Sequence, residues 1–140
     1  DATTAVVLGI LTTDGADRLL IEDNHFHGVT TAITAAIRIV GTDDTIVRNN
    51  IVTGLYAVTG AIEQVTTAGN NHLYIGNIVL NRTADGNNKA IVLKSDTTAL
   101  VVDNRMAVID STAPAPWTGA GAYFGGNYHV AAVDTAGTLL

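Results

Sequence analysis

One pattern occurs four times in this chain, in the segments DRLLIEDNHFHG (17–28), DDTIVRNNIVTG (43–54), NHLYIGNIVLN (71–81) and TALVVDNRMAV (98–108). Each segment is a β-rich run, an asparagine and a second short apolar run. The shared asparagines are Asn24, Asn50, Asn77 and Asn104, so the period is 26 or 27 residues. A regular period of this length is typical of a solenoid, in which each repeat forms one rung stacked on the last.

A second family of strand-like segments lies between the first. Its members are AVVL (5–8), AIRI (36–39), AIEQV (61–65), AIVL (90–93) and, more weakly, AYF (122–124). Their spacing is less even, 25 residues from Ile37 to Ile62 and 29 from Ile62 to Ile91, as expected if loops of variable length separate the two families. Because no window carries a helical period of 3.6 residues, the sequence predicts an all-β solenoid of about four to five rungs.

The chain resembles the right-handed, single-stranded parallel β-helix of the pectin-lyase-like superfamily. The resemblance rests on the order of parts in a repeat: an AI-x-I strand, a polar turn such as GTDD (41–44), an L-x-I-type strand, an asparagine, and a short strand before a variable loop. It implies that the four repeat asparagines lie at a two-residue bend and stack as a ladder. Asparagine suits this place because it tolerates a left-handed backbone and its amide both donates and accepts.

Composition narrows the classes of partner. The 140 residues are 47% apolar, which suffices for one domain with a core. Seven Lys and Arg against thirteen Asp and Glu give a formal charge of −6, which disfavours nucleic acid and anionic membrane as partners. The chain has no cysteine, so disulfides and thiolate metal sites are excluded.

The predicted organisation is one structural domain. Residues 1–110 are interpreted as β-helix rungs, and residues 111–140 as a final rung or cap with a C-terminal tail. Because the chain begins at Asp1 inside a strand-like run, we expect it to be the C-terminal part of a longer one.

An enzymatic site would need suitable groups on the outside of the rungs. With Ile37 inward, Arg38 points outward beneath Glu63, and this pair favours an ion pair between rungs, while Asp43 and Asp44 favour turn formation. Hydrolysis of a glycoside needs two carboxylates about 5.5 Å or about 6.5–9.5 Å apart. Arg38, Glu63, Asp43 and Asp44 therefore form only a weak alternative carbohydrate site. We predict no catalytic residue, no cofactor and no metal ion.

The outward positions around the asparagines predict a contact surface. They form two columns, His25, Ile51, Ile78 and Arg105, and His27, Thr53, Leu80 and Ala107. Ile51, Ile78 and Leu80 would make an apolar patch that a loop or another subunit must cover. The candidate interface residues are His25, His27, Ile51, Ile78, Leu80 and Trp117, and Trp117 has the alternative role of capping the last rung.

The two histidines at the start of this surface raise the question of a metal site. His25 and His27 lie on one side of a strand, but none of the residues stacked on them is a good ligand, so a metal held within one chain is not favoured. Where copies of the chain meet at this face, the pair would instead be a pH-sensitive or metal-bridged contact.

Short β-helices with apolar flanks and little charge resemble the trimeric spike, fibre and surface-stabilising proteins of tailed phages. This resemblance implies a non-catalytic structural protein of a virion surface, such as a capsid decoration, cement, spike or fibre component. The expected partners are two further copies in a homotrimer, other virion proteins and a host glycan, without nucleic acid or membrane. The alternative is an extracellular carbohydrate-binding or polysaccharide-degrading β-helix, tailspike-like or pectate-lyase-like, whose active residues lie in upstream rungs.

Overall fold

Three parallel β-sheets make up the fold. The computed structural model describes residues 8–13, 15, 17–29, 34–56, 60–65, 70–83, 89–93, 98–108, 117–119 and 123–130. Sheet A contains β1 (Leu8–Leu11), β4 (Ala35–Val40), β7 (Gly60–Val65), β10 (Lys89–Leu93) and β13 (Trp117–Gly119). Sheet B contains β2 (Leu20–Glu22), β5 (Ile46–Arg48), β8 (Leu73–Ile75), β11 (Leu100–Val102) and β14 (Tyr123–Gly125). Sheet C contains β3 (His25–Gly28), β6 (Ile51–Gly54), β9 (Ile78–Asn81), β12 (Arg105–Val108) and β15 (Tyr128–Val130).

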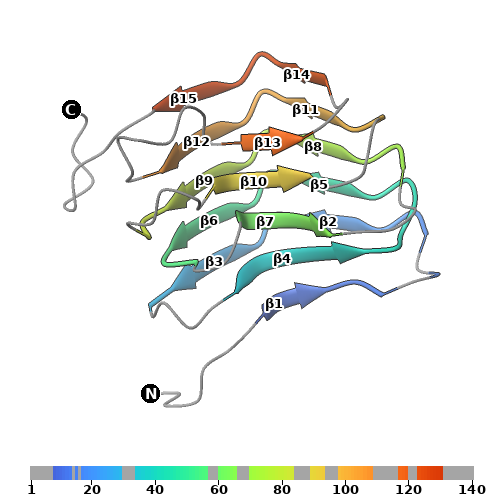
Figure 1. Ribbon diagram of the computed structural model, residues 1–140, viewed down its shortest axis with the longest axis horizontal. Helices are drawn as coiled ribbons and strands as arrows, with labels where there is room; N and C mark the ends of the chain where they lie inside the picture. Colours follow the sequence, from blue (N-terminus) through green and yellow to red (C-terminus); the bar gives the residue numbers. More distant parts are fainter. Residues whose placement is uncertain are drawn as a thin grey trace.

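The chain visits sheets A, B and C in turn, and each visit to all three makes one rung. Figure 1 shows the rungs stacked from β1, β2 and β3 at one end to β13, β14 and β15 at the other. All strand pairs within the sheets are parallel. This architecture confirms the predicted all-β parallel β-helix. The described residues include no helix long and apolar enough to cross a membrane.

Strand register follows the spacings in the sequence. In sheet A, Ile37 pairs with Ile62 and Ile62 pairs with Ile91, so the uneven steps of 25 and 29 residues are absorbed in the connections. The next pair in this sheet joins Ile91 to Trp117. Trp117 therefore occupies the register position above Ile91, within a rung that continues all three sheets. The remainder of the predicted cap and tail, residues 111–116, 120–122 and 131–140, lies outside the described residues.

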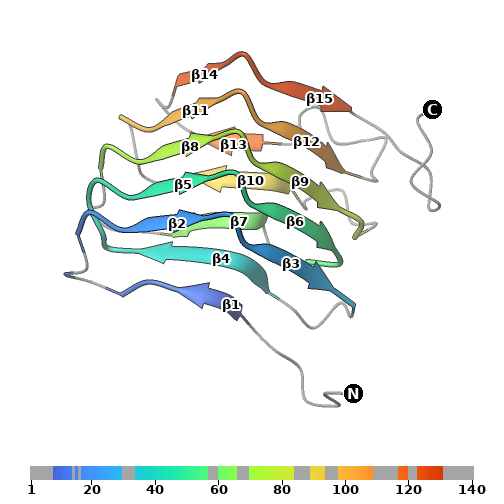
Figure 2. The same cartoon turned by 180° about the vertical axis from the view of Figure 1, so that it is seen from behind.

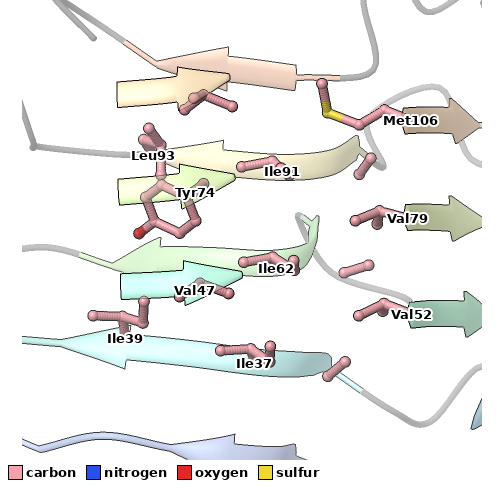
Figure 3. Close-up of a cluster of buried hydrophobic side chains, with 14 of the residues drawn as sticks. Ile37, Ile39, Val47, Val52, Ile62, Tyr74, Val79, Ile91, Leu93 and Met106 are labelled. Atoms are coloured by element: carbon pink, nitrogen blue, oxygen red, sulfur yellow. The ribbon is translucent and has the colours of Figure 1, made fainter. Parts of the chain in front are cut away.

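The core consists of side chains that point inward from all three sheets. Figure 3 shows Ile37, Ile62 and Ile91 one above another on sheet A. The facing columns are Val47, Tyr74 and Val101 on sheet B and Val52, Val79 and Met106 on sheet C. These residues are almost fully excluded from solvent, and each buried aliphatic side chain stabilises the fold by about 1.5–3 kcal/mol.

The bend between sheets B and C depends on two consecutive residues. The first has a positive φ in every rung: Asp23 (56°), Asn49 (54°), Gly76 (65°), Asp103 (55°) and Gly126 (62°). The second is the ladder asparagine. The sequence interpretation assigned the left-handed backbone to the ladder asparagine itself, and that was wrong. The preceding Asp, Asn or Gly takes this conformation, because these are the residues that adopt it at least cost.

The ladder asparagine ties each rung to the next through both ends of its amide. Asn77 Nδ2 donates to Val47 O (2.9 Å) and to Asn104 Oδ1 (2.9 Å). Its Oδ1 accepts from the backbone N–H of Asn50 (3.0 Å) and from Asn50 Nδ2 (3.0 Å). The same contacts join Asn24 to Asn50 and Asn104 to a fifth member, Asn127. The bend between sheets B and C is thus tied to the next rung by hydrogen bonds that are buried in the middle of the stack and partly buried at its two ends.

Removing one inner asparagine should cost far more stability than removing the lowest one. Asn77→Ala leaves buried donors on Asn50 and a buried carbonyl on Val47 without partners, so the free energy of unfolding should fall by about 2–4 kcal/mol. Asn24→Ala, at a half-exposed position, should lower it by about 1 kcal/mol or less. Urea unfolding followed by circular dichroism measures both values. Equal losses would contradict a ladder whose strength depends on burial.

Candidate functional site

A continuous apolar column stands on the outside of sheet B. It is built from the first residue of each strand, and strand pairing stacks Leu20, Ile46, Leu73, Leu100 and Tyr123 directly above one another. Leu20 is 50% exposed, Leu100 47% and Tyr123 62%, while Ile46 and Leu73 are half-buried. Exposed single leucines are common on protein surfaces, but five apolar residues in register form a ridge, which is typical of a contact surface.

The predicted interface residues of sheet C extend this ridge around the bend. Ile51 and Ile78 are stacked in register and both are exposed, and Leu80 stands beside them, half-buried. His25 lies below Ile51 and Arg105 lies above Ile78 in the same column. Figure 2 views sheets B and C from outside, with sheet A behind them. We call this combined outer surface, from Leu20 to Tyr123 on sheet B and from His25 to Tyr128 on sheet C, the B–C face.

Charged groups on the B–C face lie toward its ends. Arg48 Nη2 is 2.5 Å from Glu22 Oε2, and Arg48 Nε donates to the same oxygen (2.6 Å). An exposed pair of this kind stabilises the fold by about 1 kcal/mol or less. His27 Nδ1 is 2.9 Å from Thr53 Oγ1, and both His25 and His27 are exposed. In the middle rung of the face, the outward side chains of β8 and β9 are apolar: Leu73, Ile75, Ile78 and Leu80.

The outward column of sheet A is buried at two of its middle rungs. Strand pairing places Arg38, Glu63 and Val92 in one outward column, yet Glu63 is only 1% exposed and Val92 only 4%. The Arg38 Nε and Glu63 Oε2 atoms are 3.5 Å apart, so the predicted ion pair between these rungs is present. A carboxylate that is buried and held beside a guanidinium is inaccessible to a polysaccharide.

The remaining residues of the alternative carbohydrate site, Asp43 and Asp44, lie at the turn between sheets A and B. Asp43 Oδ1 accepts from the backbone N–H of Asn70 (2.8 Å), and the N–H of Asp43 itself donates to Asp17 Oδ1 (3.1 Å). Asp44 has a φ of 54°, and its Oδ1 accepts from Asn71 Nδ2 (3.2 Å). These aspartates therefore form the turn and link neighbouring rungs through hydrogen bonds. Over the residues that the structure describes, no three His, Cys, Asp or Glu side chains gather as metal ligands.

Tyr56 is a buried residue just after β6, where the chain leaves sheet C. Its hydroxyl donates to Thr53 O (3.1 Å), and its backbone N–H is bound by Asn81 Oδ1 (3.2 Å) and Thr83 Oγ1 (2.8 Å). The Asn81 amide is fully buried and donates onward to Lys89 O (3.0 Å). Burial raises the pKa of Tyr56 to about 12, and a backbone hydrogen bond from Gly28 opposes this shift only in part.

Two features of the site escaped the sequence interpretation. The sequence interpretation predicted the strands of sheet B but not the apolar column on their outer side. The strands LYI and LVV are apolar at all three positions, which indicates that both faces of these strands are apolar. Asn127 also went unassigned, because it follows Asn104 by 23 residues instead of the usual 26 or 27. The motif GNYHV (126–130) does carry the Gly-Asn signal of GNIVL (76–80).

Comparison with known proteins found no matching protein-family model, no matching curated protein and no matching solved structure.

Alkaline pH should destabilise the protein through Tyr56. The phenol ionises near pH 10 in the unfolded chain but only near 12 in the fold, so its contribution is fully present below pH 10 and is lost as pH rises toward 12, by about 1.4 kcal/mol per unit. Tyr56→Phe should remove this part of the pH dependence in urea unfolding. Tyr128→Phe, which alters an exposed ring, should keep it. Parallel losses in wild type and Tyr56→Phe would show that Tyr56 is not the group responsible.

Proposed function

We propose that this protein is a non-catalytic structural component that assembles side by side with two further copies through its B–C face. The observation that carries the proposal is the apolar column from Leu20 to Tyr123 on sheet B. At about 4.8 Å per rung, this column is a straight ridge roughly 19 Å tall. A rigid ridge on a prism is suited to lateral packing, because a second prism can bury its whole length without either molecule changing shape.

Electrostatics favour this face over the rest of the surface as a site of self-association. The chain carries a formal charge of −6, so two copies repel each other where their acids face one another. Along the ridge between Leu20 and Tyr123 the stacked side chains are uncharged. The carboxylate in the neighbouring outward column of sheet B, that of Glu22, is paired with Arg48. Apolar burial is therefore opposed by little charge repulsion at the place where the ridge lies.

We place the assembly on a virion surface, as a decoration, cement, spike or fibre component with other virion proteins as neighbours. The proposal draws on the resemblance of a short, weakly charged β-helix with an apolar flank to the trimeric surface proteins of tailed phages. It is also supported by the state of the outer face of sheet A, where the acid in the Arg38 column, Glu63, is buried. A scaffold of this kind contributes shape and durability rather than chemistry.

Native mass spectrometry and sedimentation should find a species of three chains. Leu100→Glu introduces a charge into the middle of the ridge and should raise the dissociation constant of the trimer at least about tenfold, because the buried leucine is lost in every copy. Leu11→Glu is the matched control: Leu11 is 50% exposed against 47% for Leu100, but it lies on sheet A. A wild-type protein that stays monomeric, or equal weakening by both variants, would overturn assembly through the B–C face.

Acidic polysaccharides incubated with the protein should yield neither unsaturated products nor new reducing ends. The reason is that the Glu63 carboxylate is buried against Arg38 and the Asp43 carboxylate is bonded to the Asn70 backbone. Glu63→Gln supplies the decisive comparison. Turnover by the wild type that disappears in this variant would replace the structural proposal with an enzymatic one.

A further inference from the structure

The two ends of the β-helix carry opposite halves of the same hydrogen-bonding pattern. Within the ladder, each asparagine donates from its backbone N–H and its Nδ2 to the Oδ1 of the asparagine one rung above, as Asn104 does to Asn127 (2.9 and 3.0 Å). At the lower end Asn24 donates in this way to Asn50, while its own Oδ1 accepts no hydrogen bond from the described residues. At the upper end the backbone N–H of Asn127 donates none within those same residues.

The backbone beside the ladder has the same polarity. The residue after each asparagine donates its N–H to the asparagine carbonyl one rung below, as Ile51 does to Asn24 (2.9 Å) and Tyr128 does to Asn104 (2.9 Å). Among the described residues, this series leaves the N–H of His25 without an acceptor at the lower end and the carbonyl of Asn127 without a donor at the upper end. An acceptor and a donor thus remain at each end, in the same relative positions as in the middle of the stack.

Among the described residues, the core is less completely buried at both ends of the stack than in its middle. Inward residues of the middle rungs are buried almost completely, whereas Ile10 and Phe26 in the lowest rung and Phe124 in the highest are only partly buried against the same core. Phe26 in β3 and Phe124 in β14 belong to strands that flank the bend with the unused ladder groups. Lysine and proline, which natural sheets place on exposed edges to prevent pairing, do not occur in the upper segment 123–130.

We propose that the upper end of one copy binds the lower end of a second copy, so that the ladder continues from one molecule into the next. Asn127 of the first copy donates its N–H to Asn24 Oδ1 of the second, and His25 of the second donates its N–H to the Asn127 carbonyl of the first. Phe26 and Phe124 are then covered by the facing rung. A second copy of this chain is the expected partner, because its lower end offers one acceptor and one donor in the positions that the donor and the acceptor of Asn127 need.

This contact differs in symmetry from the lateral assembly proposed above. Lateral packing of three prisms closes on itself, so its mass has a fixed upper limit. End-to-end stacking joins two different surfaces and repeats without closing, so it predicts a series of species that lengthens with protein concentration. The lateral contact uses the outward side chains of the B–C face and the end contact uses the backbone and amide edge groups of the terminal rungs, so each can succeed or fail independently.

Paired single-cysteine variants test the stacking directly, since the chain has no cysteine of its own. In the stack, Tyr128 of one copy lies beneath His25 of the next, as Arg105 lies beneath Tyr128 within the chain. Paired strands about 4.8 Å apart allow a disulfide between these positions. Mixing the His25→Cys protein with the Tyr128→Cys protein under mild oxidation should give a disulfide-linked heterodimer. Both sites are exposed, so the substitutions should leave the fold intact.

The matched control is His25→Cys mixed with Ile78→Cys, which places the second thiol in the same column at mid-height. The expected result is several-fold more heterodimer from the Tyr128 mixture than from the Ile78 mixture, rising with protein concentration. Equal yields from the two mixtures, or cross-links only between identical variants, would overturn end-to-end stacking. Identical-variant cross-links are also the pattern expected of side-by-side packing, so they would leave the lateral trimer standing.

Discussion

The bend between sheets B and C is the constraint on which the rest of this fold depends. A left-handed residue turns the chain, and the asparagine after it is locked to the rungs on either side, as Asn77 is to Asn50 and Asn104. A buried amide cannot move by one residue without leaving several groups unpaired. The ladder therefore sets the register of both sheets. In strands, register decides which side chains face the core and which face solvent.

Much of this arrangement could be predicted from the sequence, because stacking repeats the same residue type at the same position. The asparagine spacing identified the rungs, and the stacking of Arg38 and Glu63 predicted an ion pair that the structure contains. The burial of Glu63 could not be predicted. It depends on what covers an outward position, and no local pattern in the sequence reports that. The position of the left-handed residue could not be predicted either, because Asp, Asn and Gly all occur there and no one residue type repeats from rung to rung.

The interior is not purely apolar, and its polar members are held by specific partners. His72 is buried, and its Nε2 lies 2.7 Å from the carbonyl of Thr42, so this nitrogen carries the proton. Thr42 and Thr45, both buried, share a hydrogen bond of 3.0 Å at the same turn. Such groups contribute little net stability, but they penalise any rung that stacks out of place. These groups help to fix the alignment of rungs at the turn between sheets A and B, as the asparagine ladder does at the bend between sheets B and C.

The distance along the chain from sheet B to sheet C is the same in every rung. In each rung the sheet B strand and the sheet C strand that follows it start five residues apart, from Leu20 to His25 in the lowest rung and from Tyr123 to Tyr128 in the highest. The connections that enter and leave sheet A differ in length from rung to rung. Insertions and deletions can therefore accumulate along the two edges of sheet A while the opposite side keeps its shape. The molecule has one side that is fixed by geometry and another that is free to acquire new loops.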